Sequence, residues 1–253
     1  MAQEKPVLKS RQEIAIMRES GRIVAATLEM LVATVRPGMT TADLDQLAHD
    51  YIRSRGAVPS FKGYQGFPGS ICASVNEEIV HGIPGLRVLV AGDLLKLDCG
   101  AFYRGFHSDS ATTVVVGGGK PELDAMIAIG WEALAAGIEQ ARPGKRVEDI
   151  SATIQAVLLE HGYGVVGDGL AGHGVGRKLH ESPTVPNHGT AGQGIALVPG
   201  MTIAIEPMYT QGNPRWRMLN DGWTVVSRDR SLAAHVEHTV AITEGAPEIL
   251  TLP

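Results

Sequence analysis

Two histidines lie in the glycine-rich segment AGHGVGRKLHESP (residues 171–183). Alternating glycines are typical of loops that cradle phosphates, whereas histidine side chains hold metal ions or transfer protons. The segment alone decides neither which chemistry it serves nor whether His173 and His180 share one role.

Four carboxylates recur at matching places in two stretches of the chain, and they are Asp98, Asp109, Glu206 and Glu237. The segments LVAGDLLKLD (89–98) and LVPGMTIAIE (197–206) each end an alternating strand pattern on a carboxylate. The other two carboxylates precede the β-rich runs ATTVVV (111–116) and HTVAIT (238–243). Alternation places every second side chain on one face of a strand, so this pattern predicts strands that present carboxylates.

Asp98 and Asp109 flank the turn sequence Tyr103-Arg104-Gly105. A hairpin centred between Tyr103 and Arg104 would place the two aspartates directly opposite each other, with Cβ atoms about 4.5–5.5 Å apart. Leu95, Leu97 and Cys99 would point into the core, so Asp98 would face a cleft.

Facing carboxylates repel one another unless a proton is shared or cations bridge them. A proton-sharing pair, as in aspartic proteases, accounts for two carboxylates but not for four, whereas about two divalent ions would neutralise the whole set. A histidine nitrogen beside carboxylate oxygens suits first-row transition ions. Sites with two ions about 3.5–4 Å apart are typical of hydrolases.

The order of elements appears twice. Helical patterns run from the capping box of Ser10 and Glu13 to about Val35, from an N-cap at Thr41 to Gly56, from Pro121 to Arg142-Pro143-Gly144, and from Val147 to Gly162. An H-x-x-P motif follows in each part, at 81–84 and at 180–183. These repeats predict one α+β domain over residues 1–253, made of two pseudo-symmetric halves (about 10–118 and 119–250). Helices would cover one side of an antiparallel sheet, with a cleft at the junction.

Composition narrows the function classes. The 253 residues are 44% hydrophobic and 19% charged, as in an ordinary globular protein. The net charge of −5 disfavours nucleic acid or an anionic membrane as the main partner. The N-terminus resembles no signal peptide, no apolar run reaches about 18 residues, and Cys72 and Cys99 are too few for a disulfide scaffold. We expect a cytoplasmic protein.

Several motifs together resemble those of type I methionine aminopeptidases, in their minimal bacterial-like form, from near Val7 to the end of the chain. The motifs are CASVNEEIVHGIPG (72–85), the spacing of Asp98 and Asp109, GHGVGRKLHESP (172–183), IEPM (205–208) and DGWTVVSRDRSLAAHVEHT (221–239). His180 and Glu206 are only 26 positions apart, which leaves no room for the helical insert of type II enzymes, and we expect no N-terminal cysteine/histidine extension. The resemblance implies the duplicated pita-bread (creatinase/aminopeptidase) fold.

The resemblance also implies a set of roles. The metal ligands would be Asp98, Asp109, His173, Glu206 and Glu237, with Asp109 and Glu237 bridging two divalent ions (Co, Mn, Fe or Zn). A hydroxide between the ions would attack the scissile carbonyl, and Glu206 would also handle protons. His180 would stabilise the oxyanion, and His81 would contact the scissile amide nitrogen.

The methionine side chain would bind Tyr64, Phe67, Cys72, Leu179 and Trp223, because thioethers pack well against aromatic rings. Position 179 is often aromatic in bacterial relatives, so Leu179 is a departure. The substrates would be N-termini of nascent polypeptides with a small second residue, met at the ribosome, and the enzyme would be a monomer.

Three alternatives remain open at this point. A prolidase would share the fold but usually carries a sizeable N-terminal domain. A non-catalytic pita-bread module would lose metal ligands, and all five are present. A nucleotide-binding loop at GHGVG lacks a preceding strand pattern and a following lysine-serine/threonine pair.

The two histidines are expected to differ. His180 corresponds to His81 in the first half, and both would face substrate. His173 corresponds to Ser74, so the two metal sites would be unequal. The glycines would let the backbone pass close to the metals and the peptide.

Overall fold

The computed structural model describes residues 5–167 and 169–253, in which helices pack against antiparallel strands. The helices are α1 (Arg11–Thr34), α2 (Thr41–Ser54), the short 3-10 helix η1 (Tyr64–Gly66), α3 (Pro121–Glu139) and α4 (Val147–Glu160). The strands are β1 (Val58–Pro59), β2 (Ile71–Val75), β3 (Glu78–Val80), β4 (Leu94–Tyr103), β5 (Phe106–Val115), β6 (Gly164–Val165), β7 (Gly172–Gly174), β8 (Glu181–Val185), β9 (Thr202–Ile205), β10 (Met208–Thr210), β11 (Trp216–Met218), β12 (Val225–Ser227), β13 (Ala233–His235), β14 (His238–Ala241) and β15 (Glu248–Ile249).

The first two helices begin at capping boxes. Before α1, the Ser10 amide donates to Glu13 (2.8 Å), and the Glu13 amide donates to the Ser10 hydroxyl (3.3 Å), as predicted. The N-cap of α2 is Thr40 rather than the expected Thr41, because Thr40 forms the capping box with Asp43. The Thr41 hydroxyl instead donates to the Gly85 carbonyl (3.1 Å).

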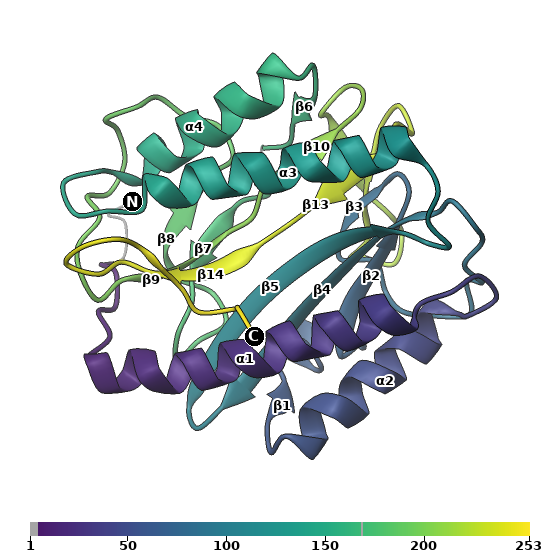
Figure 1. Cartoon of the computed structure of the whole chain (residues 1–253), viewed down its shortest axis with the longest axis horizontal. Coiled ribbons are helices and arrows are strands. Elements are labelled where there is room, and N and C mark those ends of the chain that lie inside the picture. Colours follow the sequence, from purple (N-terminus) through teal and green to yellow (C-terminus); the bar gives the residue numbers. More distant parts are fainter. Residues whose placement is uncertain (1–4, 168) are drawn as a thin grey trace.

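The strands of the described residues pair only antiparallel. They form sheets of order β1-β4-β2 with β5 beside β4, β13-β10-β6, β11-β12-β3, and β15-β14-β9-β7-β8. In Figure 1, α1 and α3 run in front of the strands, so helices cover one side of them, as expected for the pita-bread fold.

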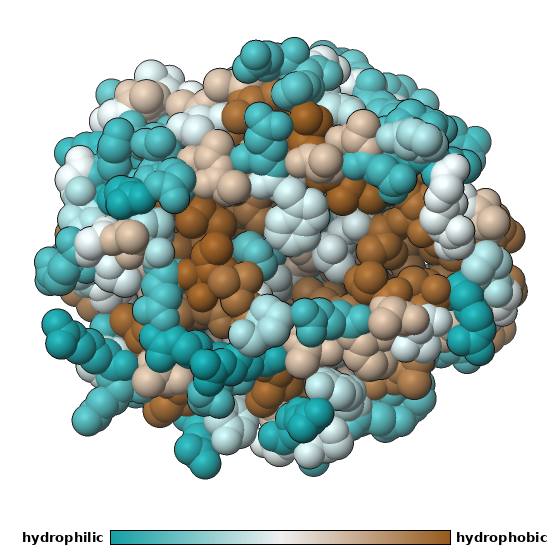
Figure 2. Space-filling view, in the orientation of Figure 1, coloured by the Kyte–Doolittle hydropathy of each residue, from teal (hydrophilic) through white to brown (hydrophobic). Residues whose placement is uncertain are grey.

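Two apolar clusters hold the helices on the strands. Leu28 of α1 and Leu44 of α2 share a buried cluster with Leu97 of β4, and Leu158 of α4 shares another with Ile203 of β9. Each buried leucine or isoleucine contributes about 1.5–3 kcal/mol to stability. Figure 2 shows the outer face of the helices, where hydrophilic side chains surround patches of apolar ones. The division into halves at about residue 118 stays a prediction.

The β4–β5 hairpin has a different register from the one predicted. Its turn residues are Arg104 (φ 48°) and Gly105 (φ 90°), one position later than expected. A two-residue turn with both central residues at positive φ matches the twist of the strands, and glycine adopts that conformation without strain. Asp109 therefore pairs with Gly100, and Asp98 with Ala111. The prediction that the two aspartates lie directly opposite each other is wrong.

The aspartates are nevertheless diagonal neighbours on the same face of the hairpin, because Asp98 lies two residues from Gly100, the cross-strand partner of Asp109. Diagonal neighbours are about 7–8 Å apart.

Candidate active site

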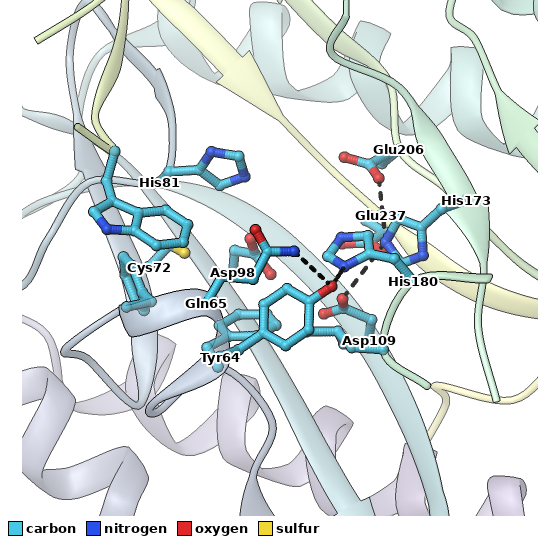
Figure 3. Close-up of a pocket in the computed structure, with 14 residues that line it drawn as sticks. Tyr64, Gln65, Cys72, His81, Asp98, Asp109, His173, His180, Glu206 and Glu237 are labelled. Carbon is cyan, nitrogen blue, oxygen red and sulfur yellow. Dashed lines mark hydrogen bonds and ion pairs between the residues drawn. The ribbon is translucent and has the colours of Figure 1, made fainter. Parts of the chain in front are cut away.

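Every residue predicted for the site lines one cavity of about 320 Å³ (Figure 3). These residues are Tyr64, Phe67, Cys72, His81, Asp98, Asp109, His173, Leu179, His180, Glu206, Trp223 and Glu237, and the cavity is also lined by Phe61 and Gln65. Carboxylates and histidines thus share a cavity with an apolar pocket.

Two strands from distant parts of the chain bring Asp109 and Glu237 together. The Asp109 amide donates to the Thr239 hydroxyl (3.0 Å), which in turn donates to the Asp109 carbonyl (2.7 Å). The Glu237 amide donates to the Ala111 carbonyl (3.0 Å). These bonds hold β5 beside the segment 235–239 and so set the distance between the carboxylates.

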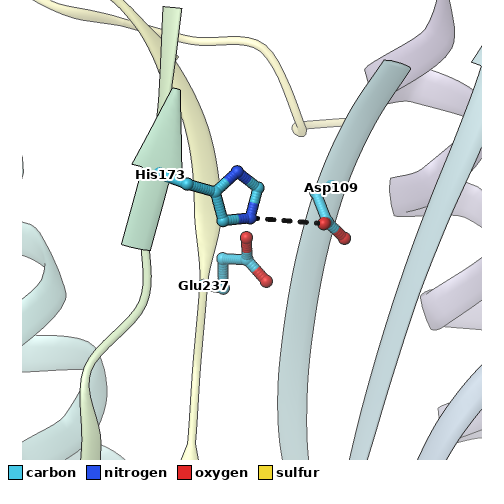
Figure 4. Close-up of side chains that lie close together, drawn as sticks. All are labelled: Asp109, His173 and Glu237. Atoms are coloured by element: carbon cyan, nitrogen blue, oxygen red, sulfur yellow. Dashed lines mark ion pairs between the residues drawn. The ribbon is translucent and has the colours of Figure 1, made fainter. Parts of the chain in front are cut away.

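His173 completes a cluster of possible metal ligands with Asp109 and Glu237, whose ligand atoms all lie within 4.8 Å of one another (Figure 4). The His173 Nε2 atom lies 3.9 Å from Asp109 and 3.8 Å from Glu206. Its Nδ1 lies 2.9 Å from the Gly174 carbonyl, which can only accept a hydrogen bond. Nδ1 therefore carries the proton, and the Nε2 lone pair points toward the carboxylates.

The carboxylates fit a cation. Asp98 Oδ1, Asp109 Oδ1 and Glu237 Oε1 are buried without a hydrogen-bond partner among the described residues. Burial raises the pKa of Asp98 to about 7, and burial with neighbouring carboxylates raises the pKa of Asp109 and Glu237 well above the usual range. Divalent ions would satisfy these oxygens and stabilise the ionised forms, and a mixed nitrogen and oxygen donor set suits first-row transition ions.

His235 belongs to this cluster and was not predicted for the site. It is 1% exposed, and its Nε2 lies 3.5 Å from Glu206 and 3.9 Å from Glu237. Burial raises the pKa of Glu206, but His235 and the other nearby histidines outweigh burial and leave that pKa below its ordinary value. The sequence signal that could have placed His235 in the site is its position two residues before Glu237, since alternate strand residues share a face.

The metal-free site should make stability depend on pH. The pKa of Asp98 is about 7 in the folded chain against an ordinary 3.8, so its contribution to stability is present below about pH 4 and is lost as the pH rises to about 7. Asparagine cannot ionise. In thermal unfolding with a chelator, Asp98→Asn should therefore gain stability relative to the unsubstituted protein between pH 4 and pH 7. A difference that is constant or shrinks over this range would contradict the prediction.

The two histidines that are expected to face substrate, His81 and His180, lie on opposite sides of the cavity (Figure 3). His180 lies at the exposed end of the loop before β8, with its Nδ1 2.8 Å from the Tyr64 hydroxyl and its ring centroid 4.1 Å from that of His173. Desolvation by the surrounding protein, with a further contribution from the neighbouring His173, lowers the pKa of His180 to about 3. The His180 imidazole is therefore neutral at neutral pH. His81 has φ 60°, a strained conformation for a non-glycine residue that is often found at functional sites.

The apolar end of the cavity contains the predicted methionine pocket. Phe67, Cys72 and Leu179 form a buried cluster, and Tyr64 and Trp223 pack against it half-buried. Phe61 also belongs to this cluster and was missed, although it lies in the aromatic-rich segment FKGYQGF (61–67). Burial raises the pKa of Cys72 well above its ordinary value, so its thiol is protonated.

The glycines of 172–176 leave space for other parts of the protein. A Cβ on Gly172 would lie 2.3 Å from the Ala204 carbonyl oxygen, and one on Gly174 would lie 2.3 Å from that of Ser182. Neither glycine has a positive φ, and both lie in β7. These contacts give no support to a phosphate cradle, and the expected close approach to the metals and the peptide stays a prediction.

Comparison with known proteins agrees with this chemistry. A family model described as metallopeptidase family M24 matches residues 15–244. A methionine aminopeptidase of Clostridium acetobutylicum is 49% identical over 97% of this chain and 98% of its own length. The chain belongs to the methionine aminopeptidases of metallopeptidase family M24.

Solved structures of this family have the same fold. The crystal structure of methionine aminopeptidase from Thermotoga maritima superposes with a TM-score of 0.96 at 40% identity, covering 98% of this chain and all of that one. Prolidase from Pyrococcus furiosus superposes with a TM-score of 0.80 at 24% identity over 66% of its chain, which shows the fold alone. The expected metallo-aminopeptidase family and pita-bread fold are confirmed. None of the helices in residues 5–167 and 169–253 is long and apolar enough to span a membrane.

Proposed function

We propose that this methionine aminopeptidase removes the N-terminal methionine from polypeptides whose second residue is small, with two divalent ions in the site. The observation that carries this proposal is the single cavity that combines the carboxylates and His173 with an apolar pocket for one side chain. The residues that would hold the ions are Asp98, Asp109, His173, Glu206 and Glu237.

Divalent ions at this site would acidify a water molecule and polarise the scissile carbonyl. The protein supplies the remaining functions. Glu206, whose pKa lies below its ordinary value, is ionised at neutral pH and can accept a proton from that water.

His180 would donate a hydrogen bond to the scissile carbonyl oxygen. The Tyr64 hydroxyl, 2.8 Å from Nδ1, would donate to that nitrogen and so keep the ring proton on Nε2. A neutral imidazole held in this way can stabilise the negative charge that develops on the oxygen. His81 would contact the amide nitrogen and assist proton transfer to the leaving amine.

The methionine pocket is expected to act mainly in binding. Trp223 packs edge-on against Phe67, with ring centroids 5.1 Å apart. A thioether contact with an aromatic ring contributes about 0.3–1.5 kcal/mol, so Trp223→Ala should lower kcat/KM for methionyl peptides roughly 3- to 10-fold. The loss should appear mainly in KM, measured with Met-Ala-Ser. An unchanged KM would remove Trp223 from the pocket.

A panel of three peptides tests the proposed activity. Metal-free enzyme should be inactive, and resupply with Mn, Co, Fe or Zn should restore cleavage of Met-Ala-Ser but far less of Met-Lys-Ser and Ala-Pro-Ser. Faster cleavage of Ala-Pro-Ser would favour a prolidase, and activity without any ion would exclude the metal mechanism. Action in the cytoplasm, contact with the ribosome, the absence of sequence-specific nucleic-acid or membrane partners, and a monomeric state stay predictions.

A further inference from the structure

The loop between β7 and β8 carries His180 at its end, and the residue that follows, Glu181, is bound by a lysine from the far N-terminus. Lys9 Nζ lies 2.5 Å from Glu181 Oε2, and the two side chains are only 2% and 4% exposed. Lys9 does not line the catalytic cavity. A buried ion pair therefore joins the N-terminal segment to the residue beside a substrate-facing histidine.

The pair is part of a connected set of contacts. The second oxygen of Glu181 accepts a hydrogen bond from the Lys178 amide (3.0 Å), and Lys9 Nζ also donates to the Val7 carbonyl (3.0 Å). The Lys9 amide donates to the Gly200 carbonyl (2.7 Å), which fixes the backbone of the segment. The ammonium group therefore reaches Glu181 from an anchored position.

Gly176 makes this arrangement possible. A Cβ at Gly176 would lie 2.3 Å from Lys9 Cε and 2.9 Å from Glu181 Oε1. The lysine side chain thus crosses the loop where a side chain at 176 would block it. The third glycine of GHGVG therefore has a specific role, which is to admit Lys9.

Stability alone gives little reason for such a pair, because an apolar pair of similar volume often stabilises a fold as well as a buried ion pair does. The ion pair instead orients Glu181, because this side chain must point away from the cavity to meet Lys9. That orientation fixes the backbone of the preceding residue, His180. An imidazole displaced by about 1 Å can lose much of its contribution to catalysis.

We propose that Lys9, through Glu181, is a positioning residue for His180. The proposal rests on the role of His180 proposed above. It predicts that an N-terminal residue outside the cavity controls turnover without controlling metal binding.

A kinetic double-mutant cycle tests this proposal on the full-length, metal-loaded enzyme. Lys9→Met should lower kcat for Met-Ala-Ser about 10-fold, with KM and bound metal nearly unchanged. In a His180→Ala background the same substitution should lower kcat less than about 2-fold, because the histidine it positions is gone. An equal loss in both backgrounds would show a general structural effect and overturn the proposal.

The cycle separates this proposal from the one it rests on. If His180→Ala alone left kcat unchanged, the role of His180 would fail, whatever Lys9 does. If His180→Ala lowered kcat but Lys9→Met did not, only the positioning role would fail.

Three further variants guard against misfolding. Lys9→Met combined with Glu181→Gln leaves no buried charge unpaired and should show the same loss of kcat, whereas kcat equal to that of the unsubstituted enzyme would overturn the proposal. Leu158→Ala, in the α4 core, should lower the melting temperature but leave kcat intact below it. Arg177→Gln removes the exposed ion pair with Glu13 (2.7 Å) on the same loop and should change kcat less than about 2-fold.

Discussion

His173→Ala will lose most of the metal affinity of the site, by about 100-fold or more. His173 is the proposed nitrogen ligand beside the carboxylates, and its Nδ1 lies 2.9 Å from the Gly174 carbonyl. Changing a residue that only orients a ligand costs about 10- to 100-fold in metal affinity, and removing the ligand itself should cost at least as much.

Two measurements check this. Calorimetric titration with Mn²⁺ gives the affinity directly. The melting temperature gives it independently, because an ion that binds only the folded state raises that temperature, and the rise should nearly vanish in the variant. His161→Ala changes an exposed histidine at the end of α4 and is the matched control. Unchanged Mn²⁺ affinity in His173→Ala would exclude His173 as a ligand.

His180→Ala should lower kcat about 100- to 1000-fold while bound metal stays nearly the same. This is the cost of removing one donor to a developing oxyanion. KM for Met-Ala-Ser should change little, because a contact made only in the transition state affects kcat and kcat/KM equally. Tyr64→Phe removes the hydroxyl that contacts Nδ1 and should give a smaller loss of the same kind.

Steady-state kinetics together with elemental analysis distinguish the possibilities. Loss of metal from His180→Ala would make His180 a ligand instead. A kcat within about 2-fold of the unsubstituted enzyme would deny it any part in the chemistry.

The predicted site residues line one cavity, and strand alternation is the reason that the sequence could place Asp98 and Asp109 together. Asp98 and Asp109 lie on the same face of their hairpin even though the predicted register was wrong. Moving the turn by one residue shifts each cross-strand partner by two positions, and residues two positions apart share a face. The register itself depended on which residue pair could adopt positive φ, and only Gly105 does so without strain.

Other features depend on contacts that no local pattern reveals. His235 was not predicted for the site, and its place behind Glu206 required the packing of β13 beside β10. The contact of Lys9 with Glu181 joins residues 172 positions apart in the sequence. Gly176 was predicted to let the backbone pass close to the peptide. The side chain that it makes room for, Lys9, lies too far away in the sequence to be predicted from a local pattern.

We propose above that five side chains of one cavity hold two neighbouring divalent ions. Diffraction from crystals grown with Mn²⁺, measured at the manganese absorption edge, tests it most directly. We expect two anomalous peaks about 3.5–4 Å apart, within ligand distance of Asp98, Asp109, His173, Glu206 and Glu237. No peak in the cavity, or peaks bound only by other residues, would contradict it.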